Sequence, residues 1–115
     1  MGYEHKLIFT DGINNGNYQR IIAEVDISRH DVFLDNLKEL FPEKLDGYIY
    51  INDEERTTDY YGNELHFTRD LKKLANWLEA DNDKSYYRRL PHVIALLRAF
   101  NKNDWEDLKV IHFGH

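Results

Sequence analysis

Alternating hydrophobic and polar positions predict two strands near the start of the chain. Residues 3–10 alternate with the period of two that is typical of a half-buried strand, and residues 18–27 do the same. The residues that share one face are Tyr3, His5, Leu7 and Phe9 in the first strand, and Ile21, Ala23, Val25 and Ile27 in the second. Residues 11–17 between them are rich in Gly and Asn, which enter turns readily. We therefore expect a hairpin.

A helix is predicted next, over residues 28–41. Ser28 and Asp31 have the spacing of a helix start, and Pro42 ends the pattern. The apolar positions recur at helical spacing as Phe33, Leu34, Leu37, Leu40 and Phe41.

The middle of the chain predicts two more strands, at 47–51 and 56–61, joined by a polar turn at 52–55. Large side chains occur at every position of 48–51, so we expect this strand to be central or covered on both faces. Residues 64–67 continue the fourth strand or begin another.

Two further helices and a last strand complete the pattern. Thr68 is a candidate N-cap with Asp70 in the first turn, ahead of an apolar stripe at Leu71, Leu74, Ala75 and Leu78. The last helical region spans about 84–101, with Pro91 at a kink or a fresh start. Its expected core positions are Leu90, Val93, Ile94, Leu97 and Phe100. Residues 109–113 read as the final strand.

The element order ββαββααβ predicts one α+β domain over residues 1–115. We expect an antiparallel or mixed sheet of about five strands with three helices packed on it. The 115 residues suit one domain with its own core.

Composition narrows the function classes. The chain has no cysteine, which excludes disulfides, thiolate metal sites and a cysteine nucleophile and favours a cytoplasmic location. The longest apolar run, 93–97, is too short to cross a bilayer, so we expect no membrane partner. The residues at the N-terminus lack the pattern of a signal peptide.

Charge is sorted along the chain. Residues 1–68 carry 14 acidic and 6 basic side chains, whereas residues 69–102 carry 4 acidic and 8 basic ones. The net charge of the whole chain is −6. A dipolar molecule of this kind is oriented by the field of a charged partner.

An acidic, tyrosine-rich segment is the main candidate for partner binding. Carboxylates there can take the place of phosphates, and tyrosines give a large contact area at low entropic cost. The predicted binding residues are Asp53, Glu54, Glu55, Asp59, Tyr60, Tyr61 and Glu64. The alternative is that these residues form a solvated hairpin whose tyrosines pack on their own sheet.

A basic segment offers a nucleic-acid alternative. Cations and aromatic rings alternate there, a mixture that holds phosphates and stacks bases. Its candidate residues are Lys84, Tyr87, Arg88, Arg89 and Arg98. The acidic net charge makes direct nucleic-acid binding the weaker hypothesis.

A metal-dependent hydrolase is the third hypothesis. His5, His66 and His112 fall on predicted strands and would converge if those strands were neighbours. An acidic residue two positions before a lysine, as in Asp107-Leu108-Lys109, occurs in metal-dependent nucleases. No phosphate-binding glycine motif or serine elbow is present, so we expect neither a cofactor nor catalysis.

These patterns favour a small acidic cytoplasmic protein that binds another protein. We expect an inhibitor of a nuclease or other nucleic-acid-handling protein, of the immunity or phage anti-defence type. A homodimer is left open by the sequence.

Overall fold

The computed structural model describes residues 6–12, 18–26, 37–60, 62–80, 90–102, 105 and 107–114. The structure confirms the α+β class. The strands are β1 (Lys6–Gly12), β2 (Gln19–Asp26), β3 (Glu43–Lys44), β4 (Ile49–Ile51), β5 (Glu54–Arg56), β6 (His66–Thr68) and β7 (Leu108–Phe113). The helices are α2 (Leu37–Leu40), α3 (Leu71–Ala80) and α4 (Leu90–Asn101).

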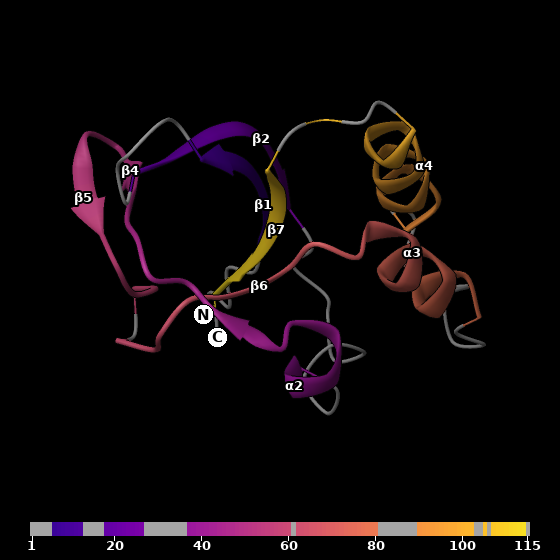
Figure 1. Ribbon diagram of the computed structural model, residues 1–115, viewed down its shortest axis with the longest axis horizontal. Coiled ribbons are helices and arrows are strands. Elements are labelled where there is room, and N and C mark those ends of the chain that lie inside the picture. The colour runs from indigo at the N-terminus through magenta and orange to yellow at the C-terminus, as the bar shows by residue number, and fades with distance from the viewer. Residues whose placement is uncertain are drawn as a thin grey trace.

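Five strands form an antiparallel sheet in the order β2-β1-β7-β6-β3, and β4 and β5 form a separate antiparallel pair. Viewed as in Figure 1, the large sheet curves into an arc, with α3 and α4 on its outer side and β4 and β5 across from it on the inner side. The hairpin predicted from the first two strands is confirmed as the β1–β2 pair.

The strand buried on both faces is β7, whose six residues are all buried. It lies between β1 and β6, so neither of its edges nor either of its faces meets water. The prediction that residues 47–51 would be covered on both faces is wrong. Ile49 and Ile51 point inward, but Tyr50 between them is 45% exposed. The run of large side chains was misleading there, because tyrosine fits a solvent-facing strand position as well as a buried one.

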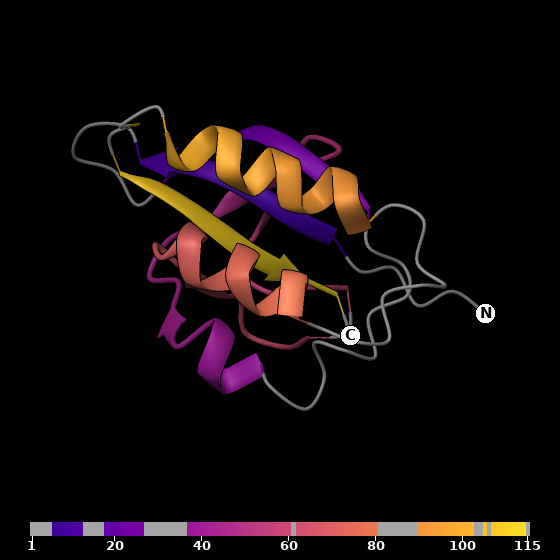
Figure 2. The ribbon, with the colours of Figure 1, turned by 90° about the vertical axis from the view of Figure 1, so that its right-hand side faces the viewer.

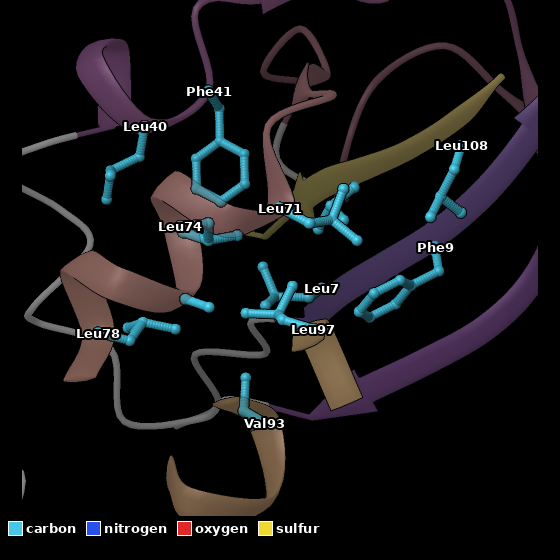
Figure 3. Packing of buried hydrophobic residues seen from close by; sticks show 12 residues of the cluster. Leu7, Phe9, Leu40, Phe41, Leu71, Leu74, Leu78, Val93, Leu97 and Leu108 are labelled. Carbon is cyan, nitrogen blue, oxygen red and sulfur yellow. The ribbon is translucent and has the colours of Figure 1, made fainter. Parts of the chain in front are cut away.

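One core lies between the sheet and the helices. Leu7, Phe9 and Val110 contribute the sheet side, as the alternation of β1 predicted. The helices add the predicted stripe of α3 together with Val93 and Leu97 of α4. Figure 2 shows α3 and α4 lying side by side over this face, and Figure 3 shows their leucines meeting Leu7 and Phe9.

A second core fills the concave side of the sheet. Its members come from the arc and from the segments that close it: Ile8, Leu45, Ile49, Ile51, Leu65, Phe67, Ile111 and Phe113. The β4–β5 pair joins the edge of the large sheet through a bridge between Tyr18 and Tyr48, and the Gln19 amide donates to the Tyr48 carbonyl oxygen at 2.9 Å. This attachment fixes the position of the β4–β5 hairpin.

The turn of that hairpin is shorter than expected. Asn52 and Asp53 have φ angles of 53° and 63°, so both adopt the left-handed conformation that a tight two-residue connection requires. Glu54 and Glu55, predicted to belong to the turn, lie on β5 instead. The fourth strand is therefore 54–56 rather than 56–61, because both faces of this two-stranded hairpin leave room for exposed glutamates.

The helix boundaries depend on side-chain caps. Asp70 caps α3, since its Oδ1 accepts a hydrogen bond from the Lys73 amide at 2.9 Å. Thr68, the predicted cap, ends β6 and accepts from the Asp70 amide at 3.0 Å. In α4, Pro91 lies in the first described turn, where its missing N–H is harmless. α2 ends at Leu40, before Pro42 as predicted, while residues 28–36 lie outside the described residues.

A buried lysine organises one end of the sheet. The Lys109 ammonium donates to Asp107 Oδ2 at 2.8 Å and to Gln19 Oε1 at 3.0 Å, and its side chain is only 6% exposed. Asp107 also accepts from the Gly12 amide at 3.0 Å and from Arg69 at 2.6 Å. Asp107 thus joins the start of β7 to the end of β1.

A second carboxylate lies at the same end of β1. Asp11 accepts two hydrogen bonds from the Arg20 guanidinium, at 2.7 and 3.0 Å, and one from the Trp105 indole at 2.8 Å. Its side chain is 7% exposed. Bidentate contacts of this kind hold both partners in one geometry.

We expect Asp107→Asn to lower the free energy of unfolding by about 1–3 kcal/mol. Asparagine tolerates the φ of 55° at this position and keeps an acceptor, but Lys109 loses its counter-charge. Urea unfolding measures the change. Glu24→Gln is the control, because Glu24 faces Lys6 at 3.8 Å on the surface and should contribute less than about 0.5 kcal/mol. Equal losses in the two variants would contradict the role of Asp107.

Stability should fall in acid through Asp11 and Asp107. The hydrogen bonds from Arg20 and Trp105 lower the pKa of Asp11 below its ordinary value of 3.8. Partial burial raises the pKa of Asp107, but hydrogen bonds from Lys109 and Arg69 outweigh it and leave that pKa lowered as well. Lowered folded pKa values give stability that is present above the unfolded value of 3.8 and is lost as pH falls through the folded values.

The measurement is the urea midpoint between pH 7 and pH 2.5. The double variant Asp11→Asn, Asp107→Asn should be less stable at pH 7 and should show a flatter acid limb. If the urea midpoint of the double variant fell as steeply with pH as that of the unmodified chain, other carboxylates would be responsible for the loss of stability in acid.

Candidate functional site

Three of the predicted partner-binding residues gather on the β4–β5 hairpin. Asp53 lies at its tip, and Glu54 and Glu55 follow on β5, all three exposed. Successive strand residues point to opposite faces, so Glu54 and Glu55 leave the hairpin on different sides. The carboxylates of the acidic segment are thus divided between the two faces of the hairpin.

Asp59 does not belong to the exposed surface. It is 2% exposed, its Oδ1 accepts from the Asn63 amide at 3.0 Å and its Oδ2 accepts from the Asn63 side chain at 3.1 Å. The Asp59 amide donates in return to the Asn63 carbonyl oxygen at 2.9 Å. Asp59 therefore closes a turn and is not available to a partner, which corrects its inclusion among the binding residues.

The remaining predicted residues are dispersed. Glu64 is exposed and pairs with Lys44 at 3.2 Å, so its charge is already balanced within the molecule. Tyr61 lies outside the described residues. Tyr60 is 44% exposed, and its ring packs edge-on against Phe113 at 5.1 Å between centroids.

Arg56 completes the surroundings of Tyr60. Its guanidinium lies over the Tyr60 ring at 4.7 Å from the centroid and is 3.4 Å from Glu54. Two of its nitrogens also donate to the carbonyl oxygens of Thr58 and Asp59, at 3.1 and 2.8 Å. On this face of the hairpin one arginine joins a tyrosine and a glutamate.

The opposite face carries three tyrosines that the sequence reading did not select. The rings of Tyr18, Tyr48 and Tyr50 pack on one another with centroid separations of 5.6–5.7 Å. Tyr50 lies directly across from Glu55 in the register of β4 and β5. We call Tyr18, Tyr48, Tyr50 and Glu55 the tyrosine–carboxylate face. The signal for it was the alternation of tyrosine with isoleucine in 48–51, which places both tyrosines on one side.

The electrostatics of this face keep the phenol neutral. Desolvation, followed by the negative charge of Glu55, raises the pKa of Tyr50 above its ordinary value of 10.0, and a hydrogen bond to Glu55 adds to the rise. Near neutral pH the face therefore presents a protonated phenol beside a carboxylate. It is equipped to bind groups that carry positive charge and hydrogen-bond donors.

The basic segment is represented by a single described residue. Arg98 donates to Asn76 at 3.1 Å and to Glu79 at 2.5 Å, so it connects α4 to α3. Lys84, Tyr87, Arg88 and Arg89 lie outside the described residues. The nucleic-acid alternative stays a prediction. To bind a phosphate, Arg98 would have to release its hydrogen bonds to Asn76 and Glu79.

The register brings two of the predicted histidines together. His66 of β6 lies directly opposite His112 of β7, whereas His5 is outside the described residues. His112 packs against Phe41, and the His66 ring is 3.2 Å from the Glu64 carbonyl oxygen. Among the described residues no three potential metal ligands form a group. Asp107 and Lys109 bind each other, which leaves neither directed at a substrate.

The chain matches none of the protein-family models, curated proteins or solved structures with which it was compared. None of the described helices has the length and apolar composition needed to cross a membrane.

Glu55→Gln should lower the pKa of Tyr50 toward 10.0, because the neutral amide no longer disfavours the phenolate. NMR titration of the tyrosine ring carbons measures this change. Glu54→Gln is the matched control, since it removes the same charge from the other face of the hairpin. A Tyr50 titration that responds equally to both variants would show that Glu55 is not its specific neighbour.

Proposed function

We propose that this chain is a protein-binding protein that engages a basic partner through the tyrosine–carboxylate face. The observation that carries the proposal is the pairing of exposed Tyr50 with Glu55 across β4 and β5. An exposed aromatic ring beside a carboxylate combines contact area with charge, the two properties of energetic centres in protein interfaces.

The hairpin is held in place before any partner arrives. Ile49 and Ile51 anchor it in the second core, and the Gln19–Tyr48 hydrogen bond ties it to β2. Its two-residue turn leaves little freedom at the tip. A preorganised surface loses less conformational entropy on binding than a loose loop would.

The charge of the molecule favours approach from the hairpin side. The described parts of 69–102 contain five cationic side chains and two carboxylates, and they form the helical layer on the far side of the sheet from β4 and β5 in Figure 1. Among the described residues the helical layer is thus net positive, whereas Asp53, Glu54 and Glu55 with Arg56 make the end of the hairpin net negative. This distribution of charge would turn the hairpin toward a positive surface and the helices away from it.

The class of partner follows from this chemistry. Proteins that handle nucleic acids present basic surfaces to phosphates, and carboxylates on a rigid hairpin can occupy the same surface. An inhibitor of such a protein, of the immunity or anti-defence type, is the specific form of the proposal. Of the residues predicted for direct nucleic-acid binding only Arg98 is described, and its pairing with Glu79 makes it less accessible to a phosphate.

The test begins with capture of partners from the cytoplasm of the native host at low and moderate salt, followed by mass spectrometry. Association of the purified partner is then measured with Asp53→Lys, Glu55→Lys. We expect this variant to bind about tenfold more slowly at low salt, and we expect the difference to shrink as salt screens the field.

Glu39→Lys, Glu43→Lys is the matched control, because it changes net charge equally at exposed positions away from the hairpin tip. The control should associate at close to the unmodified rate. Equal slowing by both variants would remove the hairpin from the proposal. Recovery of nucleic acid alone, or of no protein partner, would overturn the protein-binding function.

A further inference from the structure

Two exposed tyrosines lie at the β4–β5 hairpin: Tyr50 is on β4, and Tyr60 is in the turn that follows β5. Tyr50 is 45% exposed and Tyr60 is 44% exposed, and each is accompanied by one of the two adjacent glutamates of β5. Glu54 is on the side of Tyr60, and Glu55 faces Tyr50. The two pairs differ in what lies between ring and carboxylate.

The Tyr60 pair is occupied by the protein's own arginine. The Arg56 guanidinium lies 4.7 Å from the ring centroid and 3.4 Å from Glu54, so stacking and charge act on one group. Its side chain is 15% exposed, whereas that of Glu54 is 68% exposed. A guanidinium thus lies between a tyrosine ring and a glutamate on this side of the hairpin, where the carbonyl oxygens of Thr58 and Asp59 also hold it.

The Tyr50 pair has no such cation within the described residues. The described lysines and arginines that form ion pairs do so with other carboxylates, and those that lie over rings lie over Phe67 or Tyr60. Tyr18, next to β2, and Tyr48, two residues before Tyr50, pack against the Tyr50 ring. The Tyr50 ring and the Glu55 carboxylate thus lie opposite each other without a cation from the described part of the chain between them.

We propose that the tyrosine–carboxylate face receives an arginine side chain of the partner, with its guanidinium stacked on Tyr50 and its N–H groups donating to Glu55. This inference rests on the proposed function and specifies its partner as one that presents an exposed arginine. The stacking would repeat that of Arg56 over Tyr60, with the Glu55 carboxylate as acceptor where Arg56 uses the carbonyl oxygens of Thr58 and Asp59.

Arginine fits the face better than lysine. A guanidinium is planar and weakly hydrated, so it lies flat on a ring while its edge donates to a carboxylate. An ammonium is compact and more strongly hydrated, and it gains less from the ring. The face should therefore distinguish the two cations as well as attract both.

The test uses two capped tripeptides, glycine–arginine–glycine and glycine–lysine–glycine, titrated into the whole protein and followed by NMR. The arginine peptide should shift the Tyr50 ring resonances with a dissociation constant about two- to fivefold lower than that of the lysine peptide. Glu55→Gln should weaken arginine-peptide binding by about two- to fivefold.

Matched variants on the other face are the controls. Glu54→Gln removes the same charge one residue away, and Tyr60→Leu removes an equally exposed ring while the Tyr50 resonances can still be followed. The controls should leave the response to the arginine peptide within about twofold of the unmodified protein. Unfolding curves for each variant exclude loss of the fold as the cause.

Three results would overturn the inference: no shift at Tyr50, equal binding of the two peptides, or equal weakening by Glu54→Gln and Glu55→Gln. A Tyr50 shift that depends on protein concentration alone would identify a second copy of the chain as the occupant and would also overturn it. If the peptide test failed but association with the partner still depended on the hairpin carboxylates, the proposed function would stand without this inference. If partner association did not depend on the hairpin carboxylates while the peptide response was selective, the proposed function would fail and the arginine preference of this face would stand.

Discussion

The pairing of β7 with both β1 and β6 is the constraint on which the rest of this structure depends. Six consecutive buried residues give one set of side chains to the helical core and the other to the core on the concave face. A strand in this position has every backbone N–H and C=O group removed from water, so its pairing on both sides is obligatory. Lys109 is buried as a consequence, and Asp107 and Gln19 supply the partners that its charge requires.

The same alternation that builds the cores also builds the candidate site. In β4 the isoleucines turn inward and fix the hairpin, and Tyr50 must then turn outward opposite Glu55. Core and surface are therefore two sides of one three-residue strand. A change at Ile49 or Ile51 would disturb the tyrosine–carboxylate face without touching it, because the inward side chains set the orientation of the outward ones.

Sequence periodicity predicted the elements whose signal is local. The alternation of β1, the stripe of α3 and the stop at Pro42 each depend on neighbouring residues, and each is found. Part of the candidate surface follows from the sequence, because Asp53, Glu54 and Glu55 are all exposed on one hairpin. Asp59 is instead buried in a local turn with Asn63. The contribution of Tyr18 depends on which segments meet across the fold. The bridge from Tyr18 to Tyr48 joins residues thirty positions apart, and no local pattern encodes it.

The strand order also has a consequence for synthesis of the chain. β1 is synthesised about a hundred residues before its partner β7, so most of the sheet cannot close until β7 has been made. During that interval β1 and β6 each have an edge that only β7 will cover. The nascent chain would depend on the β1–β2 hairpin and local helices, and closure of both cores would follow as one late event.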